Sequence, residues 1–169
     1  MGEARSSSSR FARPEDAVSW RTPIEQAGAI CYRTSENSAI EVLLVASRRN
    51  GSWGIPKGCI EAGETPSVAA AREAMEEAGV RGTVSTETLG SFFYRKAGDD
   101  LSYHIKVHLL EVTETLSDFP EKQTRRLKWA LLETAAKEVS HPKLRDLLFW
   151  SRGRMRPQIR ESSFLISAK

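Results

Sequence analysis

GCIEAGETPSVAAAREAMEEAGV, which runs from Gly58 to Val80, is the stretch of this chain from which its fold can be predicted. Thr65 suits the N-cap of a helix, Pro66 suits its first position, and Gly79 suits the position just past its end. Several alanines, which favour helix strongly, lie between these signals. The stretch therefore predicts a glycine-rich loop that leads into a short helix.

Three carboxylates share one face of that predicted helix. Glu73, Glu76 and Glu77 stand at spacings i, i+3 and i+4, and like charges at these spacings repel one another. Hard divalent cations such as Mg²⁺ take oxygen ligands, so a bound metal would explain the cluster. A solvated acidic face would be the preferred interpretation of these glutamates alone. The glycine-rich approach and Arg72, placed directly before the cluster, favour the metal.

The same stretch resembles the Nudix box of the Nudix hydrolase superfamily. That pattern is Gly, five residues, Glu, seven residues, then Arg-Glu-aliphatic-any-Glu-Glu-any-Gly-aliphatic. The matching positions here are Gly58, Glu64, Arg72, Glu73, Ala74, Glu76, Glu77, Gly79 and Val80. Ala74 is smaller than the usual aliphatic residue, which affects packing rather than chemistry.

The resemblance implies a fold and a catalytic apparatus. It implies an α+β protein with an α/β/α sandwich, in which a mixed sheet lies between helices and the box forms a loop-helix-loop beside it. It implies that Mg²⁺, with Mn²⁺ as a substitute, is bound by Glu73, Glu76, Glu77 and the main-chain carbonyl of Lys57. Arg72 would hold the carboxylates, Glu76 would be the general base, and Glu64 would brace the loop.

Residues 26–150 resemble, more specifically, the diphosphoinositol and diadenosine polyphosphate hydrolases of that superfamily. The stretches that carry this likeness are 42–48, 66–83, 109–119, the arginine-rich segment before Trp129 and His141-Pro142-Lys143. The likeness implies that phosphate-binding side chains come from Ser47, Arg48, Lys57, Arg95, Lys96 and Arg126, and less strongly from His141 and Lys143. Glu121 is either a further acid of the site or a solvated loop charge.

Two departures bear on the substrate. The inositol-specific members carry basic residues where this chain has Ile24, Glu25 and Gln26, and Pro-Lys-Gly at 56–58 replaces their Pro-Gly-Gly. The predicted reaction is Mg²⁺-dependent hydrolysis of a phosphoanhydride bond in a small anionic substrate, either a dinucleoside polyphosphate or a diphosphoinositol polyphosphate, by metal-activated water. The alternatives are an RNA 5′-pyrophosphohydrolase, an ADP-ribose or NTP pyrophosphatase, and a non-catalytic nucleotide-binding regulatory module.

Composition and charge are those of an ordinary globular protein. The chain is 40% hydrophobic and 28% charged, and it contains two cysteines without a CxxC spacing, which favours a reducing compartment such as the cytoplasm. The net charge of +3 comes from the two ends of the chain, so the middle is mildly acidic. This distribution argues against nucleic-acid and membrane binding. It does not indicate an oligomeric state.

The remaining pattern predicts three regions: a flexible leader at 1–21, one catalytic domain at 22–151 and a basic tail at 152–169. Within the domain we expect strands at 27–32, 40–47, 89–94, 103–112 and 125–132, and helices at 133–139 and 143–151. Along 103–112, His104, Lys106 and His108 share one strand face. That face either lines an anion-binding cleft or is an ordinary solvent face.

Overall fold

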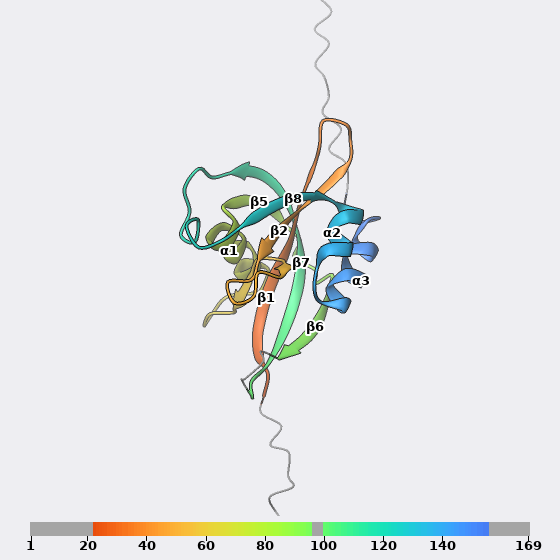
Figure 1. Ribbon diagram of the computed structural model, residues 1–169. Coiled ribbons are helices and arrows are strands. Elements are labelled where there is room, and N and C mark those ends of the chain that lie inside the picture. The colour runs from red at the N-terminus through yellow and green to blue at the C-terminus, as the bar shows by residue number, and fades with distance from the viewer. Residues whose placement is uncertain (1–21, 96–99, 156–169) are drawn as a thin grey trace, which may run out of the picture.

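The computed structural model describes residues 22–95 and 100–155, which form a sheet with helices on both sides (Figure 1). The predicted leader at 1–21, Lys96 and residues 156–169 of the predicted tail lie outside the described residues. The elements in chain order are β1 (Ile24–Thr34), β2 (Ile40–Ala46), β3 (Trp53–Gly54), β4 (Lys57–Cys59), α1 (Pro66–Ala78), β5 (Val80–Val84), β6 (Gly90–Arg95), β7 (Ser102–Thr115), β8 (Leu127–Leu131), α2 (Leu132–Glu138) and α3 (Pro142–Ser151).

The sheet is mixed, and β1 and β7 form its centre. These two strands run parallel, with Gly28 opposite Val107, and the central path continues as β3-β2-β1-β7-β5. Three further strands attach to this path, β4 to β1, β6 to β7 and β8 to β2, all antiparallel. Because β1 is buried on both faces from Gln26 to Tyr32, its side chains form part of two separate cores.

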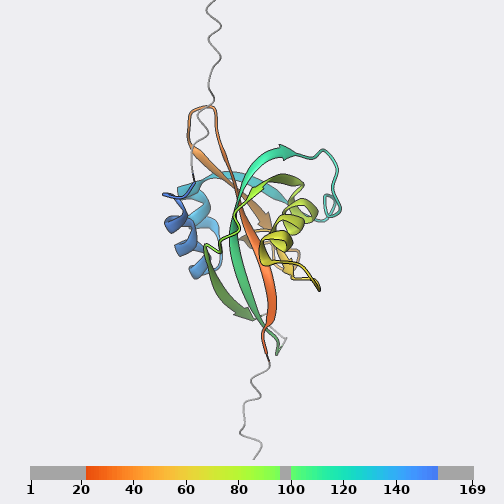
Figure 2. The same cartoon turned by 180° about the vertical axis from the view of Figure 1, so that it is seen from behind.

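Each face of the sheet has its own core. Helix α1 packs on one face, where small side chains on both partners, such as Ala29 and Ala74, allow a close approach. Helices α2 and α3 cover the other face through larger side chains that include Leu144 and Leu148. Figure 2, seen from behind, shows α1 and the α2–α3 pair on opposite sides of the sheet. The predicted α/β/α sandwich is confirmed, and Ala74 lies fully buried in the small-residue core.

Helix α1 begins and ends where its signals predict. The Thr65 hydroxyl accepts a hydrogen bond from the backbone N–H of Val68 at 3.3 Å, and Pro66 occupies the first turn. Gly79 adopts the left-handed conformation with φ 62°, and its N–H bonds the carbonyl of Met75. A side chain at Gly79 would collide with the ring of Phe119, whose nearest carbon lies 2.3 Å from the position of a built Cβ. The end of the helix is therefore joined to the segment that precedes β8.

The structure contains three strands that the sequence pattern does not reveal. Strands β3 and β4 hold two and three residues, too few for an alternating pattern to be visible. Strand β5 follows directly on Gly79, and a bulge between Arg81 and Gly82 interrupts its register. The other predicted strands and helices are all present, with β1 and β7 longer than expected.

Neither expectation for the face that carries His104, Lys106 and His108 is correct as stated. His104 and Lys106 both contact the carboxylate of Glu25, at 2.9 and 3.1 Å. His108 is buried, and its Nδ1 donates to the carbonyl of Ser85 at 2.9 Å. The face is divided because only its His108 end lies under the segment that follows β5. No helix in the described part of the chain is long and apolar enough to cross a membrane.

Candidate active site

Two carboxylates of α1 lie against strand β4 rather than in open solvent. Glu73 and Glu77, one turn apart, are buried, whereas the side chain of Glu76 keeps about a third of its surface exposed. The Glu73 carboxylate lies over Gly58, and a Cβ built there would stand 2.0 Å from Oε1. The backbone N–H of Lys57 donates to Glu77 Oε2 at 3.2 Å. A glycine at position 58 is thus required for this close approach.

Arg72 holds three of the carboxylates at once. Its Nε and Nη2 form a fork to Glu64 at 2.8 and 3.0 Å, and its Nη1 reaches Glu73 at 2.7 Å and Glu76 at 3.1 Å. Nη2 also donates to the carbonyl of Cys59 at 2.9 Å, which ties the loop to the helix. The hydrogen bond from Arg72 lowers the pKa of Glu64 to about 2. Arg72 therefore joins Glu64, Glu73 and Glu76, and its role in catalysis stays a prediction.

A second arginine, which the sequence did not single out, holds the remaining acids. Arg125 lies just before β8 and is almost completely buried. Its guanidinium contacts Glu77 Oε1, donates to Glu121 Oε2 at 2.6 Å, and reaches the carbonyl of Ala46 at 3.3 Å. The sequence predicts a phosphate-binding role for the adjacent Arg126 instead, because a pair of adjacent arginines does not reveal which side chain points inward.

Glu121 is fixed beside the helix and is not a freely solvated loop charge. Its backbone N–H donates to the carbonyl of Glu76 at 3.0 Å. Upstream in the same loop, the N–H of Leu116 donates to the carbonyl of Gly79 at 2.7 Å, and the Phe119 ring covers that glycine. The side chain of Glu121 also lies 3.5 Å from Arg48. Glu121 is therefore a fifth carboxylate beside Glu64, Glu73, Glu76 and Glu77.

Burial makes the two inner carboxylates poor anions. Desolvation raises the pKa of Glu77, and this outweighs the opposing charges of Arg125 and Lys57. Desolvation also raises the pKa of Glu73 despite its hydrogen bond to Arg72, and the charges of Glu76 and Glu121 add to the effect. The nearby arginines and Lys57 therefore do not fully offset the cost of burying these two negative charges.

The donor chemistry of this cluster fits a hard divalent cation. Glu73, Glu76, Glu77 and Glu121 offer carboxylate oxygens, the ligands that such an ion prefers. In the part of the chain that the structure describes, no three His, Cys, Asp or Glu side chains already converge as a metal site. The reason is visible in the contacts above, since Arg72 and Arg125 each draw carboxylates toward a guanidinium.

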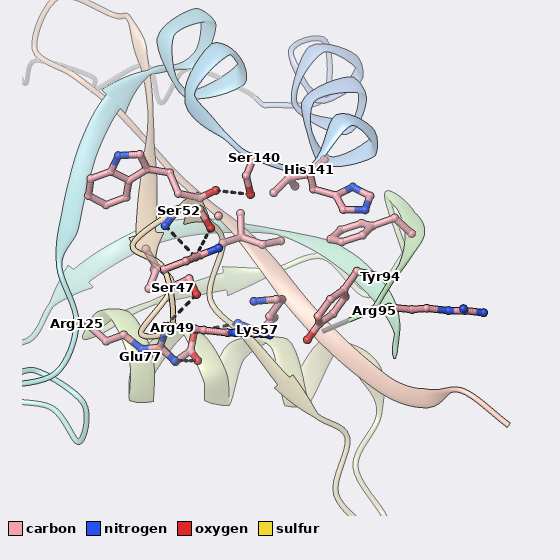
Figure 3. Close-up of a pocket in the computed structure, with 17 residues that line it drawn as sticks. Ser47, Arg49, Ser52, Lys57, Glu77, Tyr94, Arg95, Arg125, Ser140 and His141 are labelled. Atoms are coloured by element: carbon pink, nitrogen blue, oxygen red, sulfur yellow. Dashed lines mark hydrogen bonds and ion pairs between the residues drawn. The ribbon is translucent and has the colours of Figure 1, made fainter. Parts of the chain in front are cut away.

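A cavity of about 590 Å³ opens beside this cluster (Figure 3). Glu77, Arg125, Arg49 and Lys57 lie together at the α1 end of the cavity, while Ser140 and His141 lie toward α2 and α3. Its other lining residues are Val45, Ser47, Asn50, Ser52, Trp53, Gly54, Ile55, Phe92, Tyr94, Arg95 and Leu144. The cavity therefore has a charged end and an aromatic end.

The aromatic end is held rigidly by the turn between α2 and α3. The carbonyl of Trp53 accepts from the N–H of Ser140 at 3.1 Å. The His141 ring lies 4.3 Å from the ring of Phe92, and its Nε2 bonds the carbonyl of Phe93 at 3.1 Å. Tyr94, which also lines the cavity, stacks on Tyr103 with ring centroids 4.9 Å apart. Strands β3 and β6 are thus joined across the cavity through one turn.

The structure brings some of the predicted phosphate-binding residues into this cavity and leaves others outside its lining. Ser47, Lys57 and Arg95 line it, and Arg95 extends outward from the end of β6. Arg48 faces Glu121, while Arg126 donates to the carbonyl of Gly51 at 3.4 Å and lies 5.5 Å from the Trp53 ring. Of the two weaker candidates, His141 lines the cavity and Lys143 lies 5.0 Å from the Trp150 ring.

Several lining residues are not among the site residues predicted from the sequence. Arg49, Trp53 and Tyr94 come from a loop and two strands that meet only in the folded chain. Trp53 and Tyr94 could have been identified only by knowing that β3 and β6 both border the α2–α3 turn. Arg49 could have been identified from the loop 48–52, where the adjacent Arg48 was chosen instead.

Comparison with known proteins identifies relatives over most of the described chain. The model of the NUDIX domain matches residues 24–150. "Nudix hydrolase 16, mitochondrial" of Arabidopsis thaliana is 36% identical over 121 residues, covering 68% of this chain and 67% of that protein. Diphosphoinositol polyphosphate phosphohydrolase 2 of Rattus norvegicus is 37% identical over 116 residues, covering 67% of this chain and 61% of the rat protein. The chain thus spans about two thirds of the length of these relatives or less.

A solved structure supports the same relationship. The crystal structure of the C. elegans Ap4A hydrolase has a TM-score of 0.61 and 27% identity, and the match covers 79% of this chain and all of that one. Both the sequence and the architecture of residues 24–150 are therefore shared with proteins of one family.

Proposed function

This chain belongs to the Nudix hydrolase family, and we propose that it is a divalent-metal-dependent pyrophosphohydrolase that splits a phosphoanhydride bond of a dinucleoside polyphosphate. The observation that carries the proposal is a cluster of five carboxylates beside a cavity that has a charged end and an aromatic end. Such a substrate has a phosphate chain and a base, and each end of the cavity suits one of them.

A phosphoanhydride resists attack by water because its negative charges repel the nucleophile. A divalent cation, Mg²⁺ or Mn²⁺, held by Glu73, Glu77 and the main-chain carbonyl of Lys57 would neutralise that charge and make water more acidic. We assign the general base to Glu76, because its partly exposed carboxylate remains reachable while Arg72 fixes its direction at 3.1 Å. Arg72 acts by orienting the carboxylates, and Glu121 supplies a further acid at the same face.

The phosphate chain is proposed to lie at the charged end of the cavity. Arg49 and Lys57 line that region and Ser47 offers a hydroxyl, so positive charge and hydrogen-bond donors face a polyphosphate. Arg95 lines the cavity farther along and extends outward from the end of β6. Arg48 and Arg126 lie beside this lining and are proposed to reach the outer phosphates. Lys96 keeps the same proposed role on the strength of the family resemblance.

The aromatic end favours a nucleobase over an inositol ring. Trp53, Phe92, Tyr94 and His141 bring aromatic rings to the lining, and such rings can stack on a base but offer little to a ring of phosphates and hydroxyls. Glu25, which stands where the inositol-specific relatives carry basic residues, forms an ion pair with Lys106 at 3.1 Å and contacts His104 at 2.9 Å. A diphosphoinositol polyphosphate remains the second candidate, supported by the cluster of cations at the charged end.

A panel of substrates with Mg²⁺ tests the proposal. Release of phosphate products should be fastest with diadenosine tetra- to hexaphosphates and slower with a diphosphoinositol polyphosphate. ADP-ribose, nucleoside triphosphates and 5′-triphosphorylated RNA complete the panel as the other enzymatic alternatives. Turnover of none of them, combined with tight nucleotide binding, would replace the proposal with the non-catalytic binding module.

A variant of the aromatic end separates the two leading substrates. Trp53→Leu should raise KM for the dinucleotide by about tenfold, because one stacked base contributes roughly 1–3 kcal/mol. The same variant should leave KM for the diphosphoinositol polyphosphate nearly unchanged. An equal rise for both substrates would remove Trp53 from base recognition.

We also infer a reducing compartment, with the cytoplasm as the simplest choice, from the two free thiols of Cys31 and Cys59. Fractionation of cells that express the chain at native level tests this inference. A pool confined to mitochondria, the compartment named in the Arabidopsis relative, would contradict the choice of the cytoplasm, and a pool confined to the secretory pathway would contradict the reducing compartment itself.

A further inference from the structure

Arg125 occupies a position that the family pattern around the helix does not explain. Its side chain and that of Glu77 are each about nine-tenths buried, and they face each other at the α1 end of the cavity. The same guanidinium donates to Glu121 at 2.6 Å. It thus lies between an acid of the helix and an acid of the loop that follows β7.

We propose that Arg125 is a positioning residue that serves as the resident counter-cation of Glu77 and Glu121 in the metal-free protein, and that a divalent cation bound by Glu77 must replace the Arg125–Glu77 contact. The inference rests on the proposed function, because it assumes that Glu77 is a metal ligand. It goes beyond that function because it makes the Arg125 guanidinium a competitor of the metal ion for the Glu77 carboxylate.

The charges around the helix require such a counter-cation. Glu64, Glu73 and Glu76 share Arg72, so the positive charge of Arg72 is already divided among three acids. Arg125 pairs with the remaining acids, Glu77 and Glu121. The charge of Lys57 also acts on Glu77, and Arg48 adds a longer contact of 3.5 Å to Glu121. Two carboxylates brought together at a buried site without a cation would repel each other strongly.

The backbone at Glu121 is held against α1 by contacts that do not involve the Arg125 guanidinium. The backbone N–H of Glu121 bonds the carbonyl of Glu76, the N–H of Leu116 bonds the carbonyl of Gly79, and Phe119 packs over Gly79. These contacts hold the loop against the helix through main-chain atoms and an aromatic ring. Removing the guanidinium should therefore leave both acids in place and expose their charge to a metal ion.

The experiment compares metal-free stability with metal affinity in the full chain. Arg125→Gln removes the charge while keeping a polar side chain, and Arg81→Gln is the control, since it removes the same charge from a surface pair with Glu114 at 3.8 Å. Thermal unfolding is followed in chelator, and Mn²⁺ binding is measured by calorimetry and by the loss of the free-ion EPR signal. Arg125→Lys is the second variant, which keeps a charge without the fork.

The two measurements should move in opposite directions for Arg125→Gln. In chelator its Tm should fall by on the order of 5–10 °C, because a buried anion loses its partner. Its Mn²⁺ dissociation constant should decrease about tenfold, the equivalent of one charge-assisted hydrogen bond that the ion no longer has to break. Arg125→Lys should lie between the wild type and Arg125→Gln in both measurements. Arg81→Gln should change neither, since exposed pairs contribute little.

The outcomes separate this inference from the proposed function. If the wild type binds no Mn²⁺, the proposed function fails. If the wild type binds Mn²⁺ while Arg125→Gln binds it with equal or lower affinity, Arg125 is a structural brace or a metal-site support and the counter-cation role is wrong. Should Arg125→Gln not fold in chelator, Arg125→Lys decides the question, because weaker Mn²⁺ binding by that variant also refutes the competition.

Discussion

Gly58→Ala should weaken metal binding while leaving the fold almost intact. A Cβ at position 58 would stand 2.0 Å from Glu73 Oε1 and 2.2 Å from its carboxyl carbon, both far inside contact distance. The clashing atoms are the end of a flexible side chain, so the Glu73 carboxylate should rotate away and leave the backbone where it is. That rotation breaks the 2.7 Å hydrogen bond from Arg72 and moves an oxygen donor out of the cluster.

The expected loss of stability is small because two effects oppose each other. Losing one charge-assisted hydrogen bond costs roughly 1.5–3 kcal/mol. Replacing a glycine at a position without positive φ stabilises by about 0.4–1 kcal/mol, through a less flexible unfolded chain, and Gly58 is such a position. The free energy of unfolding should therefore fall by about 1–2 kcal/mol. Metal affinity should fall by about 10- to 100-fold, as when an orienting contact of a metal ligand is removed.

Urea unfolding in chelator and Mn²⁺ calorimetry measure the two quantities. Gly54→Ala is the matched control, because Gly54 lies in the neighbouring short strand and a Cβ there meets no atom within 4 Å. That variant should change the free energy of unfolding by less than about 0.5 kcal/mol and leave metal affinity unchanged. Wild-type Mn²⁺ affinity in Gly58→Ala would refute the placement of Glu73 in the metal site.

Three further predictions follow from local geometry. Gly79→Ala should lower the free energy of unfolding by about 2–4 kcal/mol in urea titrations, because it adds left-handed strain to a collision with Phe119; a loss below 1 kcal/mol would contradict the packing. In the native protein a thiol reagent should modify exposed Cys59 but not Cys31, since burial raises the pKa of the Cys31 thiol and excludes the reagent; modification of both at equal rates would contradict the fold. Burial raises the pKa of Glu77, so its contribution to stability is complete below its ordinary pKa of 4.5 and is lost as the pH rises through the raised value. In chelator, the stability of the wild type relative to Glu77→Gln should accordingly decline from pH 4 to pH 7, and a rise over that range would reverse the assigned cause.

The helix α1 could be predicted from the sequence nearly residue by residue, because its ends depend on local chemistry. Thr65, Pro66 and Gly79 each act on backbone atoms within a few residues of themselves. The Arg72 clamp was predictable for the same reason, since its partners lie on the same helix or in the loop that precedes it. Local signals thus account for one half of the candidate site.

The other half depends on contacts that no local pattern reports. Arg125 reaches Glu77 only because the loop after β7 is fastened to the end of α1, 48 residues away along the chain. His108 shares its alternation pattern with His104, yet His108 is buried beside the segment after β5 while His104 is only partly buried and contacts Glu25. Trp53 sits in a strand of two residues whose partner strand lies earlier in the chain. Side chains placed by tertiary contacts of this kind were beyond sequence reasoning.

The most direct test of metal-dependent hydrolysis is the initial rate of product release from diadenosine tetraphosphate by the wild type and by Glu76→Gln, each in Mg²⁺ and in chelator. The side chain of Glu76 keeps about a third of its surface exposed, and glutamine has the same shape, so both proteins should show the same thermal unfolding in chelator. We expect the wild type to turn over only in Mg²⁺, and Glu76→Gln in Mg²⁺ to be slower by about 10²- to 10⁴-fold, the range for loss of a general base. A wild-type rate that persists in chelator, or a Glu76→Gln rate close to that of the wild type, would contradict the assigned chemistry.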